Sequence, residues 1–290
     1  MSHTRTLDEC IKEAEEKKIA LGHFNVSNLE MMWAIGRVAK ELGVPVVIGV
    51  SEGERNFVGT KQTRAMVDSI KEELDHPIFL NADHTYTVEG VKEAIDAGYD
   101  SVIFDGTKLS TEENLKKTRE VVMYVRSRSA HTLVEAELGN IGHGSVVRDS
   151  IPEEAAHNES MYTKPDFAKM FVDETGVDLV APAVGNIHGM VKSGNPHIKT
   201  DLIEQIREFA GVPLVLHGGS GITDEDFIKG IEAGISTIHI NTELRLAWRQ
   251  GLVQGLSQNP DEIAPYKYVT DAIEAFSDLI ERRIKLFARI

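Results

Sequence analysis

Cysteine, aromatic residues and long apolar runs are scarce in this sequence of 290 residues. It contains one cysteine, Cys10, and 6% aromatic residues. A single cysteine excludes an internal disulfide and is typical of a reducing compartment. No apolar run approaches the ~20 residues of a membrane span, and the charged segment Met1–Glu16 lacks the apolar core of a signal peptide. We therefore expect a soluble, cytoplasmic protein without a membrane partner.

Positive charge is also scarce. Lysine and arginine together number 31, against 46 aspartate and glutamate residues, and the formal net charge is -15. Nucleic acid and anionic membrane surfaces are therefore not expected as partners. A protein of this charge that binds a phosphate must do so with local donors, against its overall field.

The chain shows no linker and no shift of composition, and it alternates between apolar strands and amphipathic helices. The predicted strands are Ala20–Val26, Pro45–Ser51, Pro77–His84, Ser101–Gly106, His131–Gly139, Leu179–Gly185, Leu214–Leu216 and Thr237–Thr242. Strands that are apolar on both faces and separated by helices indicate a parallel sheet.

The fold class that this alternation favours is α/β, a (β/α)8 TIM barrel formed as one domain by residues 1–290. The helix predicted at Asp271–Phe287 would be an extra C-terminal element, and residues 140–163 are expected to be irregular. An open doubly wound sheet is the alternative. It is weakened because no Gly-x-Gly-x-x-Gly follows the first strand.

Three histidines follow or end predicted strands. His84 ends the third, His188 follows the sixth, and His217 ends the seventh. Because the carboxyl ends of barrel strands share one rim, the three imidazoles can converge there. Three imidazoles with an open coordination position describe a catalytic zinc site, in which the metal acts as a Lewis acid. A single histidine at a strand end is more often a packing residue, so the prediction rests on the three together.

Carboxylates lie on the same predicted rim. Asp83 could act as a general acid–base beside the metal, or it could hold a histidine tautomer. Asp105 and Glu137 could orient the ligands or form a second cation position, and Glu135 is expected to point into the barrel. A buried ion pair is the alternative for these carboxylates.

A glycine-rich segment, Gly218–Gly221, joins the seventh strand to a helix that Thr223 is expected to cap. Backbone N–H groups in such a turn, ahead of a helix N-terminus, favour an anion. Asn241 and Thr242 at the end of the eighth strand would complete the cradle, because phosphate sites in these barrels use these two loops. Lys192 could supply a counter-charge.

These motifs together resemble the class II, metal-dependent fructose-bisphosphate and tagatose-bisphosphate aldolases. The resemblance rests on Asp83-His84, Tyr162-Thr163-Lys164-Pro165, Gly185-Asn186-Ile187-His188-Gly189 with Lys192, and His217-Gly218-Gly219-Ser220-Gly221. It implies a zinc ion held by His84, His188 and His217, or Co²⁺ or Mn²⁺ in its place. It also implies reversible cleavage of a ketose 1,6-bisphosphate into dihydroxyacetone phosphate and glyceraldehyde 3-phosphate.

The resemblance also implies roles for individual residues. Asp83 would exchange the proton of the C4 hydroxyl, Asp105 and Glu137 match a second metal position, and Ser51 and Arg245 match positions that some members use for the far phosphate. A monovalent cation, Na⁺ or K⁺, is common in the family. The implied substrate-binding set is Asn25, Ser51, Gly189, Lys192, Gly218, Gly219, Ser220, His239, Ile240, Asn241, Thr242 and Arg245.

The sequence departs from the family pattern in three places. Many members carry an acidic pair in the loop after the fifth strand, but the segment Gly139–Ser145 here has none, and we hypothesise that His143 or a water molecule takes over its proton-transfer role. His239 and Asn241 stand where an asparagine and often an aspartate occur, so His239 could reshape the donor site or simply pack. Val191 stands where a tyrosine is common.

These departures bear on the substrate. Fructose 1,6-bisphosphate is the first expectation, and tagatose 1,6-bisphosphate, a deoxy-phosphogluconate or a singly phosphorylated ketose are alternatives. A metal-dependent barrel hydrolase and a phosphosugar-binding scaffold without activity are further alternatives. Family members are dimers or tetramers, so a homodimer or homotetramer is expected.

Overall fold

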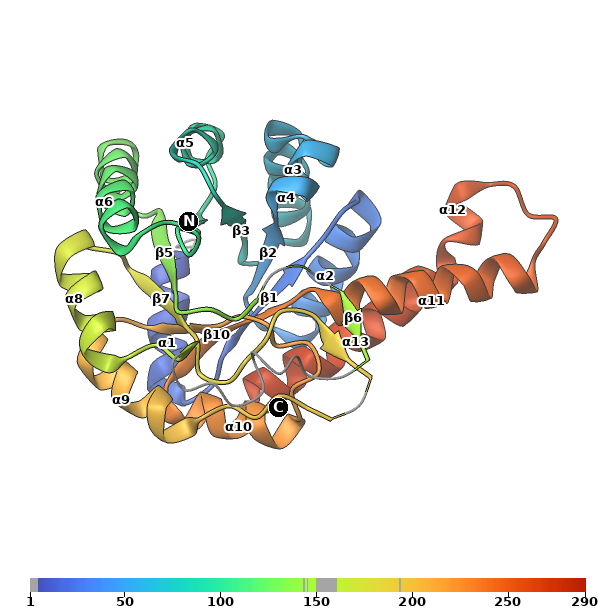
Figure 1. The fold of residues 1–290 in the computed structure, drawn as a ribbon. Helices are drawn as coiled ribbons and strands as arrows, with labels where there is room; N and C mark the ends of the chain where they lie inside the picture. The colour runs from blue at the N-terminus through green and yellow to red at the C-terminus, as the bar shows by residue number, and fades with distance from the viewer. Residues whose placement is uncertain (1–4, 143, 145, 150–160, 193) are drawn as a thin grey trace.

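Eight parallel strands close into a barrel in the part of the chain that the structure describes (Figure 1). The structure is a computed structural model, and it describes residues 5–142, 144, 146–149, 161–192 and 194–290. The barrel strands are β1 (Leu21–Asn25), β2 (Val46–Val50), β3 (Ile78–Thr85), β4 (Ser101–Phe104), β5 (Leu133–Leu138), β7 (Leu179–Pro182), β9 (Leu214–Leu216) and β10 (Ile235–Ile240). The predicted (β/α)8 barrel is therefore confirmed.

The barrel strands are buried on both faces, as their apolar sequences predict. Every residue of β1 and β2 is buried, and the same holds for β4, β5, β7, β9 and β10. Each strand pairs in parallel with its neighbours, and β1 pairs with both β2 and β10 to close the ring. Parallel closure places the carboxyl ends of all strands at one mouth.

Helices surround this ring (Figure 1). They are α1 (Leu7–Lys17), α2 (Leu29–Leu42), α3 (Glu52–Val58), α4 (Thr60–Leu74), α5 (Val88–Asp96), α6 (Thr111–Arg128), α8 (Pro165–Thr175), α9 (Thr200–Ala210), α10 (Asp224–Ala233), α11 (Thr242–Gln258), α12 (Pro265–Tyr268) and α13 (Thr270–Ala288). The predicted C-terminal helix corresponds to α13, which packs against α11 and α2. No helix in the described ranges is long and apolar enough to cross a bilayer.

Side-chain caps fix where several helices begin. Asn28 accepts a hydrogen bond from Met31 N at the start of α2, and Thr223 does the same from Asp226 N at α10. The cap of α6 is Ser110, in a reciprocal capping box with Glu113.

Helix α1 closes the end of the barrel opposite the mouth. Its buried face (Leu7, Cys10, Ile11 and Ala14) forms one apolar cluster with side chains from β1, β2, β3, β5, β7 and β9, among them Phe79 of β3. Sequence analysis did not indicate that the N-terminal segment would occupy this position.

The sequence did not predict four short elements. Helix α3 lies between β2 and α4, and α12 precedes α13. Strands β6 (Val147–Arg148) and β8 (Met190–Val191) pair in parallel outside the barrel. The segment expected to be irregular thus contains a strand, which packs beside the chain that follows β7. The α11–α12 segment extends away from the barrel (Figure 1).

Candidate active site

A break in the regular geometry of β3 builds the centre of the site. Successive strand side chains normally alternate between faces, yet Asp83 and His84 both line the cavity at the mouth. The pairing of β3 with β4 shifts between Ala82 and Thr85, and His84 has φ 34°, in the left-handed region. This bulge turns two consecutive side chains toward the same space.

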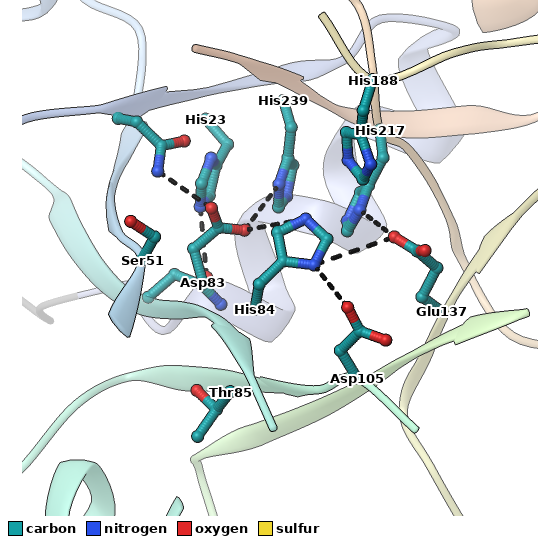
Figure 2. Close-up of polar contacts among 12 residues, drawn as sticks. His23, Ser51, Asp83, His84, Thr85, Asp105, Glu137, His188, His217 and His239 are labelled. Atoms are coloured by element: carbon teal, nitrogen blue, oxygen red, sulfur yellow. Dashed lines mark hydrogen bonds and ion pairs between the residues drawn. The ribbon is translucent and has the colours of Figure 1, made fainter. Parts of the chain in front are cut away.

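Three imidazoles meet beside this bulge, as predicted. The ring centroid of His84 lies 4.8 Å from that of His188 and 5.0 Å from that of His217. With Glu137 from β5, each of these residues offers a ligand atom, and the four atoms lie within 4.8 Å of one another. Figure 2 shows the four side chains around one space.

Hydrogen bonds orient two of the rings for metal binding. His84 Nδ1 lies 3.0 Å from Asp105 Oδ2, and His188 Nδ1 lies 2.8 Å from the carbonyl oxygen of Gly142. A ring that donates from Nδ1 presents the lone pair of Nε2 to the cavity. Asp105 also accepts from the backbone and hydroxyl of Thr107, so both of its oxygens are engaged in positioning.

His217 lies between two buried carboxylates. Its Nδ1 is 2.9 Å from Glu137 Oε2, and its Nε2 is 2.7 Å from Glu135 Oε1, so Glu135 points into the barrel as expected. Burial disfavours the charged ring, but the two carboxylates hold the pKa of His217 well above its usual value. A divalent cation fits this donor set, because it would displace the protons that such rings share with carboxylates.

The other pKa shifts agree with a centre that attracts a cation. Burial opposes the charged form of His84, but Asp83, Asp105 and Glu137 raise its pKa to about 9. Burial lowers the pKa of His188 to about 4. The pKa of Asp83 lies well below its usual value despite its burial, because three histidines, His84 foremost, stabilise the charged form.

Asp83 is held on one side and faces the histidines on the other. Its Oδ2 accepts a hydrogen bond of 2.9 Å from Asn25 Nδ2. Its Oδ1 lies 3.5 Å from His239 Nδ1 and 3.9 Å from His84 Nε2. This ionised carboxylate at the edge of the histidine cluster can exchange a proton with a ligand in the cavity.

His239 packs against His23 and also lines the cavity, so packing does not exclude a role at the donor site. Its ring stacks on His23 with centroids 3.4 Å apart and planes 2° from parallel. It lies among the lining residues of the cavity. Burial lowers the pKa of His239 well below its usual value and that of His23 to about 4, so the two stacked rings are neutral.

The predicted anion cradle lines the same cavity. Gly189, Gly218, Gly219, Ser220, Asn241 and Thr242 all contribute. Gly218 has φ 61°, and a Cβ there would lie 2.3 Å from the carbonyl oxygen of Ile187, so the close approach requires glycine. Helix α11 begins at Thr242, which adds the positive end of its dipole.

Among the predicted catalytic and substrate-binding residues, three do not line the cavity or cannot be placed. Lys192 is exposed and its Nζ lies 2.8 Å from Asp149 Oδ1. Ile240 is fully buried in β10 and absent from the cavity lining. His143 lies outside the described residues.

Ser51 and Arg245 line the cavity and converge on a residue that the sequence did not suggest. Glu54 Oε1 accepts a hydrogen bond of 2.6 Å from Arg245. Its Oε2 accepts from Asn25 Nδ2 and from the backbone and hydroxyl of Ser51. Glu54 is 4% exposed and lies on the unpredicted helix α3. The only signal in the sequence was a carboxylate shortly after a strand end.

A family model described as class II fructose-bisphosphate aldolase matches residues 5–290 of the chain. The chain belongs to the class II fructose-bisphosphate aldolase family. A curated fructose-bisphosphate aldolase of Staphylococcus epidermidis is 35% identical over 287 residues, covering 97% of this chain and 96% of the relative. The fructose-bisphosphate aldolase of Staphylococcus aureus strain N315 shows the same identity and coverage.

Solved structures agree with this assignment. The YdjI aldolase of Escherichia coli K12 is 31% identical, has a TM-score of 0.80, and is matched over 96% of this chain and 94% of its own. Membership of a family of metal-dependent aldehyde-lyases confirms the resemblance predicted from the sequence. A phosphorylated sugar is therefore the substrate class of this aldolase, and a metal ion is its cofactor.

Proposed function

We propose that this aldolase is a zinc enzyme that reversibly cleaves a ketose phosphate between C3 and C4 and releases dihydroxyacetone phosphate. The observation that carries the proposal is the convergence of His84, His188 and His217 with Glu137 at the barrel mouth, beside Asp83 and the anion cradle. Three imidazoles with an open side form a typical catalytic zinc donor set.

The zinc ion would be held by His84, His188 and His217, with Glu137 close enough to join or replace a ligand. When bound, such an ion polarises a substrate carbonyl and stabilises the negative charge that develops on its oxygen. Asp105 and Glu135 would act by holding the rings of His84 and His217 in position. Co²⁺ or Mn²⁺ could replace zinc in this donor set.

Asp83 would accept the proton of the C4 hydroxyl as the C3–C4 bond breaks, and return it in the reverse reaction. Its low pKa keeps it ionised, and Asn25 fixes one oxygen so that the other faces the cavity. The donor half then needs a proton at C3. His143 or a water molecule remains our proposal for that step, since the segment Gly139–Ser145 carries no acidic pair.

The C1 phosphate would bind the cradle of Gly189, Gly218, Gly219, Ser220, Asn241 and Thr242. Backbone N–H groups and the N-terminus of α11 can neutralise a phosphate without a lysine in the lining. Lys192 could approach only if it left Asp149, and a monovalent cation near the phosphate would serve the same purpose. Fructose 1,6-bisphosphate is the first substrate to test, because the relatives bear its name.

Three further expectations accompany this proposal. The enzyme would form one domain over residues 1–290, act in the cytoplasm, and assemble as a homodimer or homotetramer. Apolar side chains exposed on and near the α11–α12 segment, such as Val253, Ile263 and Tyr266, suit a subunit contact. The alternative of a barrel hydrolase has less support, because water activation gives no use to the anion cradle.

The test is a cleavage assay on a panel of ketose phosphates. Protein stripped of metal would be loaded with zinc, cobalt or manganese and assayed for dihydroxyacetone phosphate with a coupled dehydrogenase. We expect release that depends on the metal and on Asp83. Absence of triose phosphate from every ketose phosphate, with every metal, would contradict the proposal.

A further inference from the structure

The end of the cavity at Ser51 and Arg245 has the wrong charge for a phosphate. Arg245 directs its guanidinium to Glu54 at 2.6 Å, and Glu54 is buried. The same carboxylate accepts hydrogen bonds from Ser51 and Asn25. The donors that could receive an anion at this end are thus already bound to a fixed carboxylate of the protein.

Arg245 is the only lysine or arginine among the residues that line this cavity in the described ranges. The remaining residues (1–4, 143, 145, 150–160 and 193) include neither lysine nor arginine. Lys108 lies nearby, with Nζ 5.2 Å from the ring centroid of Tyr86, but it is not part of the lining. A dianion at this end would therefore meet one cation, and that cation is paired.

Other charged groups around this end of the cavity provide no further positive charge for a phosphate. Arg55 is buried and donates to the carbonyl oxygens of Val50 and Asp83 and to the Thr85 hydroxyl, so it lies behind the lining. Glu52 adds a further carboxylate, which accepts from Tyr86 N. Fixed carboxylates near a binding site reject like charges as effectively as complementary groups attract opposite ones.

We propose that the aldehyde half of the substrate carries no phosphate, so that the enzyme acts on a ketose 1-phosphate with hydroxyl groups at its far end. This inference rests on the proposed aldol cleavage and names its substrate class. A substrate hydroxyl can donate to Glu54 beside the donors that this carboxylate already has, and it can accept from a further N–H group of Arg245, so this end offers the mixed partners that hydroxyl groups need. The hydroxyaldehyde product would leave uncharged.

The experiment compares matched pairs of ketohexoses that differ only in the second phosphate. Examples are fructose 1-phosphate with fructose 1,6-bisphosphate, and tagatose 1-phosphate with tagatose 1,6-bisphosphate. The metal-loaded enzyme is assayed for dihydroxyacetone phosphate, and kcat/KM is determined for each member. We expect at least about tenfold preference for the singly phosphorylated member of the best pair, as a few favourable and unfavourable charge contacts produce.

Two variants test whether the charge of Glu54 causes this substrate preference. Glu54→Gln keeps the shape but removes the charge and weakens the hold on Arg245, so we expect the ratio to move about tenfold or more toward the bisphosphate. Glu52→Gln is the matched control: it removes one charge from the same helix but leaves Arg245 paired, and we expect less than about a threefold change in the ratio. Thermal unfolding of both variants would show that each is folded at the assay temperature.

A preference for the bisphosphate, or a preference below tenfold for its singly phosphorylated partner, would overturn the inference while leaving the aldolase proposal intact. An unchanged ratio in folded Glu54→Gln would also overturn it. Release of no dihydroxyacetone phosphate from either member of any pair is a different result, which rejects the proposed cleavage itself. If Glu54→Gln does not fold, the wild-type ratio alone decides.

Discussion

The two ends of the barrel are built from opposite kinds of residue. At the mouth, buried imidazoles and carboxylates crowd around one space. At the other end, apolar side chains of α1 and of the barrel interior form a continuous plug. Burying a charged group lowers the stability of the fold unless the group is paired, whereas burying apolar surface raises that stability. The base of the barrel therefore stabilises a mouth that is assembled for chemistry.

This comparison implies that substitutions at the two ends of the barrel should impair different properties of the protein. Mouth variants should lose metal or activity while remaining folded, and base variants should lose stability while the folded fraction keeps its activity. Four experiments test this separation, and they are ordered here by the size of the expected effect.

The largest effect is expected from His84→Ala. Loss of one of three imidazoles should remove the metal, and kcat/KM should fall roughly 10³-fold or more, since a metal Lewis acid contributes several kcal/mol to the transition state. Metal content by atomic spectroscopy and a kinetic assay measure the two quantities. As a control, His197→Ala removes an exposed histidine outside the cavity and should change neither. Full zinc stoichiometry in His84→Ala would remove this residue from the ligand set.

Asp83→Asn should cause the second largest loss of activity. The amide cannot accept the C4 hydroxyl proton, so we expect kcat to fall about 10²–10⁴-fold, the usual contribution of a positioned acid–base group. Metal stoichiometry should stay at the wild-type value, because Asp83 lies outside the four-residue cluster. A variant that loses the metal as well would show that Asp83 acts through the metal centre and not on the substrate.

Ile11→Ala tests the end of the barrel opposite the mouth, where we expect a loss of stability and not of activity. Ile11 is 2% exposed in the plug beneath the barrel, and its truncation should lower the free energy of unfolding by about 2–5 kcal/mol. Chemical denaturation measures this change, and kcat per folded molecule should stay at the wild-type value. Met123→Ala, at a side chain of α6 that is 66% exposed, is the matched control and should change stability by less than about 0.5 kcal/mol.

The smallest effect is expected from Thr6→Ala. Thr6 caps α1 in a reciprocal box with Glu9, and its loss should cost about 1 kcal/mol of stability. The measurement is the denaturation midpoint at constant slope. A loss of several kcal/mol would mean that α1 contributes to the barrel mainly through its first turn and not through its apolar face.

Much of the fold followed from pattern, because both-face apolar strands separated by amphipathic helices leave few arrangements. The positions of His84, His188 and His217 at one rim followed in the same way, since parallel closure brings all carboxyl ends together. What the sequence could not give was the direction in which Asp83 points, because that depends on the bulge in β3.

Contacts between segments that are distant in the chain could also not be predicted from the sequence. Glu54 lies 191 positions from Arg245, and nothing local marks it as the partner of that arginine. The stacking of His23 on His239 depends on the closure of β1 against β10. Lys192 is a further case, because its place in a motif predicts a phosphate contact and nothing local in the sequence indicates that its side chain pairs with Asp149.

The left-handed backbone at His84 has a consequence for how the site tolerates movement. Two consecutive residues, Asp83 and His84, carry the carboxylate that we propose for proton exchange and a candidate metal-binding imidazole (Figure 2). A shift of β3 displaces the two groups together, so their spacing is preserved even when their position relative to β5 and β9 changes. Divergence within such a barrel can thus shift this strand end across the mouth without separating the candidate acid–base group from the candidate ligand.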